Sequence, residues 1–445
     1  MVVQSSPRAA YKISGRGASQ IAASIETGIA DGHLAPGQAL PPIRDLAAEL
    51  AVNPNTVSAA YRLLRDRGAV ETAGRRGTRV RQQPATAPRT VAWRIPPGAT
   101  DLANGNPDPR LLPELVFPRQ ASQRLYSRDA ILPGLLAAAR ARFTADSVPA
   151  EHVVLSFGAG DAIDRVLSAH LRAGDSVAVE DPGWGAVYHL LPAMSLIAVP
   201  VPIDAAGMTP AALATALKRG VRAVIITSRA QNPTGAAVSA ERAEALRALL
   251  GEYPDALLIE DDHGADITPQ HALHTVVGVT GHWAHIRSLS KAYGPDLRCA
   301  VTAADGTTAA RVAGRLRLGA GWISQLIQEQ VHRLWTDAEV EARIAAAARA
   351  YTERREALVA ALAARGIAAY GATGINVWVP VPEEAVVVSG LLAAGWAVAP
   401  GAWFRVDTPP GVRITTSNLE LPDVEPLADA LAGVLNAVGS SGGAV

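Results

Sequence analysis

The sequence predicts an α/β protein with at least two domains, a small basic domain that is mainly helical and a larger domain built on a mostly parallel sheet. The chain has 445 residues, which is about three times a common domain length. From about residue 100 onward, short β-branched runs alternate with helical stretches, a pattern typical of βαβ units. The first 98 residues carry 13 basic and 6 acidic side chains, although the whole chain is neutral. A basic end on a neutral chain favours a polyanionic partner for that end.

Residues 1–82 are predicted to form the first domain, a winged helix-turn-helix. Apolar residues recur there at helical spacing, and Asn53 stands at an N-cap position ahead of Pro54. Two short runs with the composition of strands then flank an arginine-rich turn bounded by glycine. A helix pair followed by a basic hairpin is the pattern of a winged helix-turn-helix, which binds double-stranded DNA. The expected elements are helices over 18–34, 40–50 and 53–64 and strands over 69–72 and 78–81.

Residues 83–99 are predicted to be a linker, because the segment is rich in proline and has little periodicity. Residues 100–438 then form the larger domain, with helices on both faces of its sheet. A long Ala- and Arg-rich helix followed by further strands predicts a smaller α+β subdomain over about 337–438. The Gly/Ser-rich tail 439–445 is expected to be disordered. The predicted strands cover 153–156, 176–179, 223–227, 257–259 and 286–288 in the sheet, and 377–379 and 412–415 in the subdomain.

The composition excludes several classes of protein. The first 15 residues contain no apolar core of a signal sequence, and no apolar run reaches the length of about 18 residues that a bilayer span requires. The chain is therefore expected to be cytoplasmic, with no membrane partner. Its single cysteine, Cys299, excludes an internal disulfide, and no Cys/His cluster has the spacing of a zinc site, so no metal is expected.

Lysine is rare in this chain, with three lysines against 38 arginines. One of them, Lys291, lies in Ser-Leu-Ser-Lys-Ala-Tyr-Gly, directly after a predicted strand. A lysine amine can lose its proton and form an imine, whereas a guanidinium stays protonated. An ordinary loop lysine is the alternative interpretation. The neighbouring motifs favour a pyridoxal 5'-phosphate (PLP) cofactor bonded to Lys291.

A PLP cofactor requires an acid for its pyridine nitrogen, donors for its phosphate and an aromatic face over its ring. Asp261 ends a predicted strand, where open α/β sheets bind ligands, and fits the acid. Trp184 follows the strand over 176–179 and offers the flat face. Asn232, in Asn-Pro-Thr-Gly, can bind the phenolic oxygen. The expected phosphate donors are the turn at Gly158, Ala159 and Gly160, the hydroxyls of Ser288 and Ser290, and the guanidinium of Arg298.

Ordinary structural explanations exist for each motif alone. The glycine turns can be tight turns, the tryptophan a core residue, and Arg413 a solvent-facing side chain in a late strand instead of a group that binds a ligand carboxylate. The adjacent carboxylates of the Glu-Asp-Asp-His segment can also hold a metal, but no further ligand cluster accompanies them.

Taken together, residues 100–435 resemble fold type I aminotransferases in the Asn-Pro-Thr-Gly motif, the Asp261 segment, the Ser-x-Ser-Lys motif and Arg298. With a GntR-type winged helix ahead of them, the whole chain resembles a MocR-type regulator. The resemblance implies a domain-swapped, head-to-tail homodimer. The site roles it implies are PLP held as an imine on Lys291, Asp261 on the ring nitrogen, Asn232 and His263 near the phenolic oxygen, and Arg413 on a substrate carboxylate.

Three positions depart from the family pattern. His263 stands where the family often has tyrosine, so the group beside the phenolic oxygen can titrate near neutral pH. Trp184 also stands where tyrosine is common, which preserves stacking and removes a hydroxyl. The segment Asn53-Pro54-Asn55 lacks the Ser-Arg pair that is frequent in GntR recognition helices, which puts a base contact by position 54 in doubt.

The resemblance also implies a set of DNA contacts. Arg44 is expected to contact the backbone or a base, and Asn55, Thr56 and Tyr61 belong to the recognition helix. Arg75 and Arg76 at the wing tip suit phosphates or the minor groove. The alternative for the nearby arginines at 62, 65 and 67 is an ordinary solvated helix face.

Three functional hypotheses follow from the sequence. The first is a dimeric transcription regulator whose PLP domain senses an amine, an amino acid or PLP itself. The second is a working aminotransferase with an appended DNA-binding domain, since the cofactor set is complete. The third is a DNA-binding module with a fold that no longer holds a cofactor.

Overall fold

The computed structural model describes residues 11–30, 33–35, 37–66, 69–72, 77–80, 95–116 and 130–441. The chain divides into two units, an N-terminal domain within Met1–Pro88 and a larger domain that lies largely within Arg89–Val445.

The N-terminal domain is the predicted winged helix-turn-helix. Its two strands pair antiparallel, with Val70 opposite Val80, and the helices pack around buried Ile21, Ile25 and Leu46. The first helix ends at Ala30, four residues before the predicted end at Leu34. Leu34 lies beyond the helix and packs into the core of the domain. The turn at 73–76 and most of the predicted linker lie outside the described residues. The elements are α1 (Ala18–Ala30), α2 (Ile43–Glu49), α3 (Pro54–Asp66), β1 (Val70–Thr72) and β2 (Thr78–Val80).

Local capping explains where α3 begins. The side-chain oxygen of Asn53 accepts a hydrogen bond from the Asn55 amide at 2.8 Å, and Pro54 occupies the first helical position. An N-cap side chain satisfies one of the free amides of the first turn, and proline has no amide to satisfy. The predicted start of the helix is therefore confirmed.

The larger domain is built on one sheet of eight strands, in the order β4-β11-β10-β9-β8-β5-β6-β7. The pairs β10–β9, β9–β8 and β8–β5 are parallel, whereas β11 runs antiparallel to both of its neighbours. All five predicted strands lie in this sheet, and β6, β7 and β11 are additional to them. The strands are β4 (Val153–Ser156), β5 (Ser176–Asp181), β6 (Ile197–Asp204), β7 (Gly207–Met208), β8 (Ala223–Thr227), β9 (Leu257–Asp261), β10 (His282–Ser288) and β11 (Ala300–Ala304).

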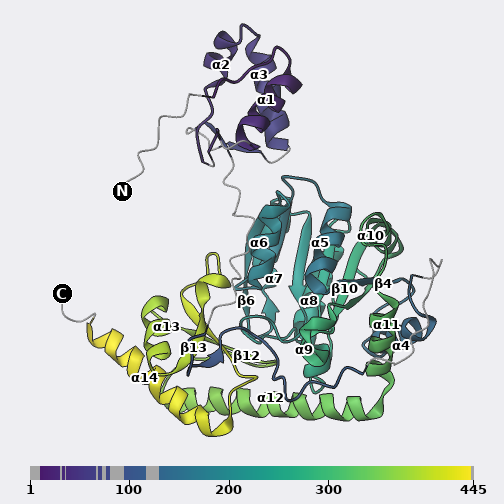
Figure 1. Ribbon diagram of the computed structural model, residues 1–445, viewed down its shortest axis with the longest axis vertical. Coiled ribbons are helices and arrows are strands. Elements are labelled where there is room, and N and C mark those ends of the chain that lie inside the picture. The colour runs from purple at the N-terminus through teal and green to yellow at the C-terminus, as the bar shows by residue number, and fades with distance from the viewer. Residues whose placement is uncertain are drawn as a thin grey trace. The chain divides into compact units, whose positions relative to one another are not determined.

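Helices cover both faces of this sheet, as predicted (Figure 1). Alternate residues of β8 show the two faces: Ile225 lies beside Ile163 of α5, whereas Val224 packs in the cluster that contains Leu246 of α8. β8 is completely buried, which explains why its sequence, Ala-Val-Ile-Ile-Thr, is an almost continuous apolar run. The helices of this part are α4 (Pro133–Ala145), α5 (Ala159–His170), α6 (Gly185–Ala193), α7 (Pro210–Lys218), α8 (Ala240–Gly251), α9 (Ser290–Tyr293), α10 (Gly306–Leu318) and α11 (Gln325–Thr336).

A second sheet, in the order β12-β14-β13-β3, forms the small subdomain. Its outer strand β3 comes from the start of the larger domain and pairs parallel with β13. The predicted boundary at about 337 is therefore wrong for residues 100–102. The long helix α12 (Ala338–Ala364) runs along the domain and leads into this subdomain (Figure 1). The other elements are β3 (Thr100–Leu102), β12 (Asn376–Pro380), β13 (Trp396–Pro400), β14 (Gly411–Thr415), α13 (Glu384–Ala393) and α14 (Val424–Ser441).

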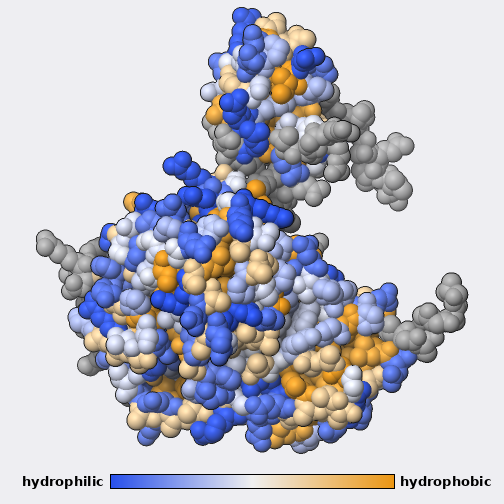
Figure 2. Space-filling view, turned by 180° about the vertical axis from the view of Figure 1, so that it is seen from behind, coloured by the Kyte–Doolittle hydropathy of each residue, from blue (hydrophilic) through white to orange (hydrophobic). Residues whose placement is uncertain are grey.

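The last helix corrects the predicted tail, because α14 continues to Ser441 and the first residues of 439–445 are helical. None of the described helices is long and apolar enough to cross a membrane. Figure 2 shows hydrophilic side chains over most of the visible face and hydrophobic side chains gathered over the small subdomain.

Candidate functional site

Lys291 lies in α9, three residues after β10 ends at Ser288. Its amine donates a hydrogen bond to the Gly105 carbonyl at 2.6 Å. Burial and the positive charge of Arg413 lower the pKa of the Lys291 amine to about 8. A larger fraction of this amine is therefore neutral at physiological pH than for an exposed lysine, which favours imine formation.

Asp261 lies at the carboxyl end of β9 and is 3% exposed. Its Oδ2 atom lies 3.1 Å from His263 Nδ1, while its Oδ1 atom is buried and has no hydrogen-bond partner in the described residues. A buried carboxylate oxygen without a partner is costly. A protonated pyridine nitrogen would satisfy it, so this atom fits the PLP ring.

His263 is held at both ring nitrogens. Nδ1 faces Asp261 and Nε2 lies 3.0 Å from the Ala230 carbonyl, which can only accept a hydrogen bond. Burial lowers the pKa of His263, but the carboxylates of Asp261 and Asp262 together raise it, and the net shift is upward. The predicted contact between His263 and the phenolic oxygen requires one nitrogen to leave its partner, and it stays a prediction.

Two of the predicted phosphate donors, the turn at Gly158 and the guanidinium of Arg298, lie together at the start of α5. Gly158 precedes the helix with a positive φ of 94°, and a Cβ added there would lie 3.5 Å from Arg298 Cζ. Arg298 also donates to the Phe157 carbonyl at 3.0 Å. Free amides at a helix start and an adjacent guanidinium form an anion site. Ser290 lies close to Ser288, since its amide donates to the Ser288 hydroxyl at 3.4 Å.

Trp184 lies beside the same turn, because a Cβ added at Gly160 would be 3.7 Å from Trp184 Cη2. Trp184 and Asp261 also line one small cavity. Trp184, the turn at Gly160 and Asp261 are therefore neighbours.

Arg413 and Asn232 are joined to each other near Gly105, whose carbonyl accepts from Lys291. Arg413 Nη1 donates to Asn232 Oδ1 at 3.0 Å, Nη2 donates to the Ala103 carbonyl, and the guanidinium lies 4.5 Å over the Phe404 ring. Burial lowers the pKa of Arg413 to about 10. Because Asn232 accepts with its oxygen, its amide nitrogen is left as the donor that a phenolic oxygen would need.

Two groups of the site are additional to those that the sequence indicates. The Gly105 carbonyl receives the Lys291 amine, and a Cβ at Gly105 would lie 3.1 Å from Arg413 Nη2. Glu180 is buried beside Asp261, and burial raises its pKa to about 7. It accepts hydrogen bonds from the Thr227 amide and hydroxyl and from Gln231. Its place directly before Asp-Pro at a strand end is the signal that could have identified it.

Several residues of the predicted DNA-contact set are accessible at the surface of the N-terminal domain, and their contacts stay predictions. Arg44 on α2 and Asn55 at the start of α3 are exposed, and Thr56 is half-buried. Tyr61 requires a correction, since it is 5% exposed and its hydroxyl donates to the Pro41 carbonyl at 2.7 Å. It is a core residue of the domain and not a free side chain. The predicted wing-tip residues Arg75 and Arg76 lie outside the described residues.

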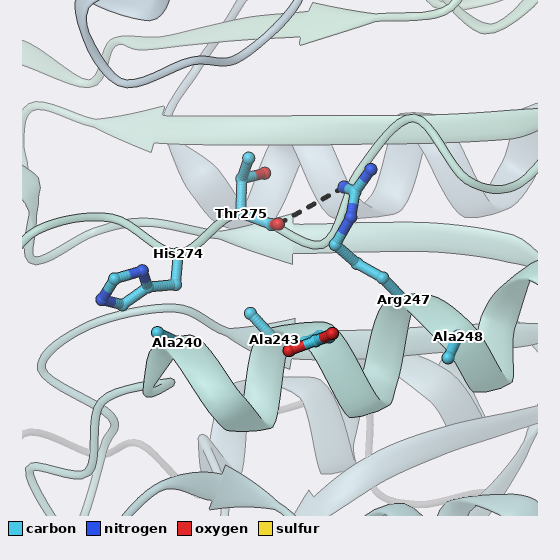
Figure 3. A pocket seen from close by; sticks show the side chains of 7 residues that line it. Ala240, Ala243, Arg247, Ala248, His274 and Thr275 are labelled. Carbon is cyan, nitrogen blue, oxygen red and sulfur yellow. Dashed lines mark hydrogen bonds between the residues drawn. The ribbon is translucent and has the colours of Figure 1, made fainter.

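A surface depression elsewhere on the larger domain contains none of the predicted site residues. It lies along α8 and is lined by Ala240, Arg247 and Thr275, among others (Figure 3). Arg247 closes one side by donating to the Thr275 carbonyl at 3.5 Å. Within the described ranges, no three His, Cys, Asp or Glu side chains group as a metal site.

Comparison with known proteins accounts for both units. The model of the gntR family of bacterial regulatory proteins matches residues 18–80, and the model of aminotransferase class I and II matches residues 124–431. The chain is 40% identical over 430 residues to the vitamin B6 salvage pathway transcriptional repressor PtsJ of Salmonella typhimurium. This match covers 95% of this chain and 100% of PtsJ. It is 25% identical to the HTH-type transcriptional regulator TauR of Rhodobacter capsulatus, over 85% of this chain and 88% of TauR.

Solved structures show the same fold for the larger domain. LysN, the α-aminoadipate aminotransferase of Thermus thermophilus, superposes with a TM-score of 0.68 at 20% identity, over 78% of this chain and 94% of LysN. The predicted fold class is confirmed. The chain belongs to the MocR-type regulators, in which a GntR-family DNA-binding domain precedes a PLP-binding domain of the class I and II aminotransferases.

Proposed function

We propose that this regulator senses PLP itself and controls genes of vitamin B6 metabolism. The proposal rests on two features of one site: the buried amine of Lys291, whose pKa is lowered, and a buried oxygen of Asp261 that has no hydrogen-bond partner among the described residues. PLP supplies an aldehyde that can react with the Lys291 amine and a ring N–H that can donate to the Asp261 oxygen. The similarity to PtsJ, which is named as a vitamin B6 salvage repressor, supports the same signal.

Bound PLP supplies an aldehyde that condenses with amines and an electron-withdrawing ring. The protein supplies the rest of the site. Lys291 presents an amine of lowered pKa, Asp261 would hold a proton at the ring nitrogen, and Arg298 with the start of α5 would balance the phosphate charge. These residues hold a ligand in place, which is what a sensor requires.

The test uses thermodynamic linkage between PLP and DNA. If PLP changes the affinity for operator DNA, then operator DNA must change the affinity for PLP by the same factor. Full-length protein would be titrated with PLP in the presence and absence of promoter DNA from genes adjacent to its own. Equal PLP affinities under the two conditions would contradict the sensing proposal.

The rate of PLP incorporation should depend on pH through Lys291. The neutral amine is the nucleophile, so with a pKa of about 8 the rate should rise about tenfold per pH unit below 8 and level off above it. Stopped-flow measurement of the growing visible absorbance would follow this rate. A rate that continues to rise beyond pH 9 would show that the amine has the pKa of an exposed lysine.

DNA binding should depend on Arg44 more than on other arginines of the same domain. Arg44→Ala removes an exposed guanidinium from α2, and we expect operator affinity to fall about tenfold, the usual size of one good contact. Arg65→Ala is the matched control, since Arg65 is exposed on the last turn of α3. Fluorescence anisotropy with labelled operator would measure both. Equal losses would indicate a general effect of charge instead of a specific contact.

An amino acid effector is the second candidate. Arg413 Nε is buried and has no partner among the described residues, so it can still take part in binding a carboxylate. Amino acids would be titrated against the PLP-loaded protein, with spectral change and oxo-acid product measured separately. A spectral change without product favours sensing, whereas sustained product formation favours a working aminotransferase.

The proposal includes a domain-swapped homodimer that acts in the cytoplasm. Winged helix-turn-helix proteins commonly read two half-sites with two heads, which supports a dimer. Light scattering of the full-length protein would show a mass near twice the 46.2 kDa of one chain. A monomeric mass with and without DNA would contradict the dimer.

A further inference from the structure

Three loops meet at Ala230, at the edge of the cofactor site. Ala230 is 4% exposed and has a positive φ of 55°. Its carbonyl accepts a hydrogen bond from His263 Nε2 at 3.0 Å, and its amide donates one to Thr373 Oγ1 at 2.9 Å. Ala230 therefore joins the loop after β9 to the small-subdomain loop before β12.

The packing around Ala230 is close on two sides. A Cβ added at Gly264 would lie 2.6 Å from the Ala230 Cβ, and one added at Gly374 would lie 2.4 Å from it. Both distances are shorter than van der Waals contact between carbon atoms. The backbone at Gly264, next to His263, and at Gly374, next to Thr373, therefore packs directly against the Ala230 side chain.

Thr373 also fixes the loop that carries Asn232. Its hydroxyl and its amide both donate to the Gly235 carbonyl at 2.8 Å. The small-subdomain loop is thus bonded on both sides of Asn232, at Ala230 and at Gly235. Its position decides where the predicted donor to the phenolic oxygen lies.

His263 links this junction to the ligand. Its Nδ1 lies 3.1 Å from Asp261 Oδ2, and the Oδ1 atom of the same carboxylate lacks a partner in the described part of the chain. A ring N–H bound at Oδ1 would fix the carboxylate and, through it, the imidazole that holds Ala230.

We propose that His263 is a positioning residue that couples occupation of the cofactor site to the small-subdomain loop 371–376, through Ala230 and Thr373. The inference rests on the proposed function, because it takes PLP as the ligand that completes Asp261. Coupling of this kind is reciprocal, so the loop strengthens PLP binding by the factor by which PLP stabilises the loop. It gives the regulator a path from cofactor loading to a rearrangement of the small subdomain.

A double-mutant cycle on the full-length protein tests the coupling, with the Kd for PLP as the readout. Thr373→Val removes the hydroxyl and should raise this Kd about fivefold. In the His263→Phe background the same change should alter the Kd less than about twofold, because the link to Asp261 is already broken. Thr280→Val is the matched control, since it removes another buried hydroxyl, which donates to the His282 carbonyl at 3.0 Å and not to the loop 371–376. It should leave the Kd unchanged in both backgrounds.

Two further measurements separate coupling from misfolding. Thr373→Ser keeps the hydroxyl and should retain the wild-type Kd. Amide hydrogen exchange over 371–376 should slow when PLP is added to the wild-type protein and should not respond in His263→Phe.

Equal effects of Thr373→Val in the two backgrounds, or a PLP response of the loop in His263→Phe, would overturn the coupling while leaving the proposed function intact. A wild-type protein that binds no PLP would overturn both.

Discussion

Lys291→Ala is expected to abolish covalent attachment of PLP and the visible absorbance of the purified protein. The Lys291 amine is the nucleophile of the site, and the guanidinium groups of Arg298 and Arg413 cannot form an imine in its place. PLP held by Asp261 and Arg298 alone should be lost on dialysis. Absorbance after dialysis would measure the loss. Mass spectrometry after borohydride reduction would locate the cofactor on the Lys291 peptide of the wild-type protein.

The chain offers a matched control in Lys218, which is exposed at the end of α7. Lys218→Ala also removes one lysine amine, but from the exposed end of α7, and should leave both the visible absorbance and operator binding unchanged. Lys291→Ala should also make operator binding insensitive to added PLP. Visible absorbance that persists in dialysed Lys291→Ala would contradict the assignment of the cofactor lysine.

The parallel centre of the fold could be predicted because its strands are buried on both faces and therefore appear as continuous β-branched runs, as in 223–227. Strand β6 could not be predicted, because its sequence contains Pro200 and Pro202. Proline argues against a strand except near the margin of a sheet. β3 has three residues and pairs with β13, nearly 300 positions later. No local pattern encodes such a partner.

The same contrast holds for the site. Asp261, Asn232 and Lys291 could be predicted because the carboxyl ends of parallel strands meet at one edge of a sheet. The Gly105 carbonyl that receives Lys291 could not, since every residue has a carbonyl and the contact spans 186 positions. Tyr61, predicted to contact DNA from the recognition helix, is instead buried in the domain core. It follows Val57 by four positions, and this helical spacing on an apolar face indicates a core residue.

Asp261→Asn is expected to raise the Kd for PLP by about 10-fold to 100-fold, because it replaces a buried, charge-assisted hydrogen bond with a neutral one. The same change removes the negative charge that raises the pKa of His263, so that pKa should fall. Absorbance titration would measure the affinity, and NMR would follow the titration of the His263 ring in the protein without PLP. The two effects have one cause, and both should therefore appear together.

The control for this change is Asp164→Asn on α5, where the carboxylate is partly exposed and accepts from the Ser168 hydroxyl. It alters charge by the same amount on the same domain, so any general electrostatic effect on an anionic ligand would appear there as well. An unchanged Kd in Asp261→Asn would show that the ring nitrogen is not paired with this carboxylate. A fall in the His263 pKa without a loss of PLP affinity would mean that Asp261 serves the His263–Ala230 junction alone. The acid that binds the ring nitrogen would then be a different residue, and the neighbouring buried carboxyl of Glu180 would be tested next.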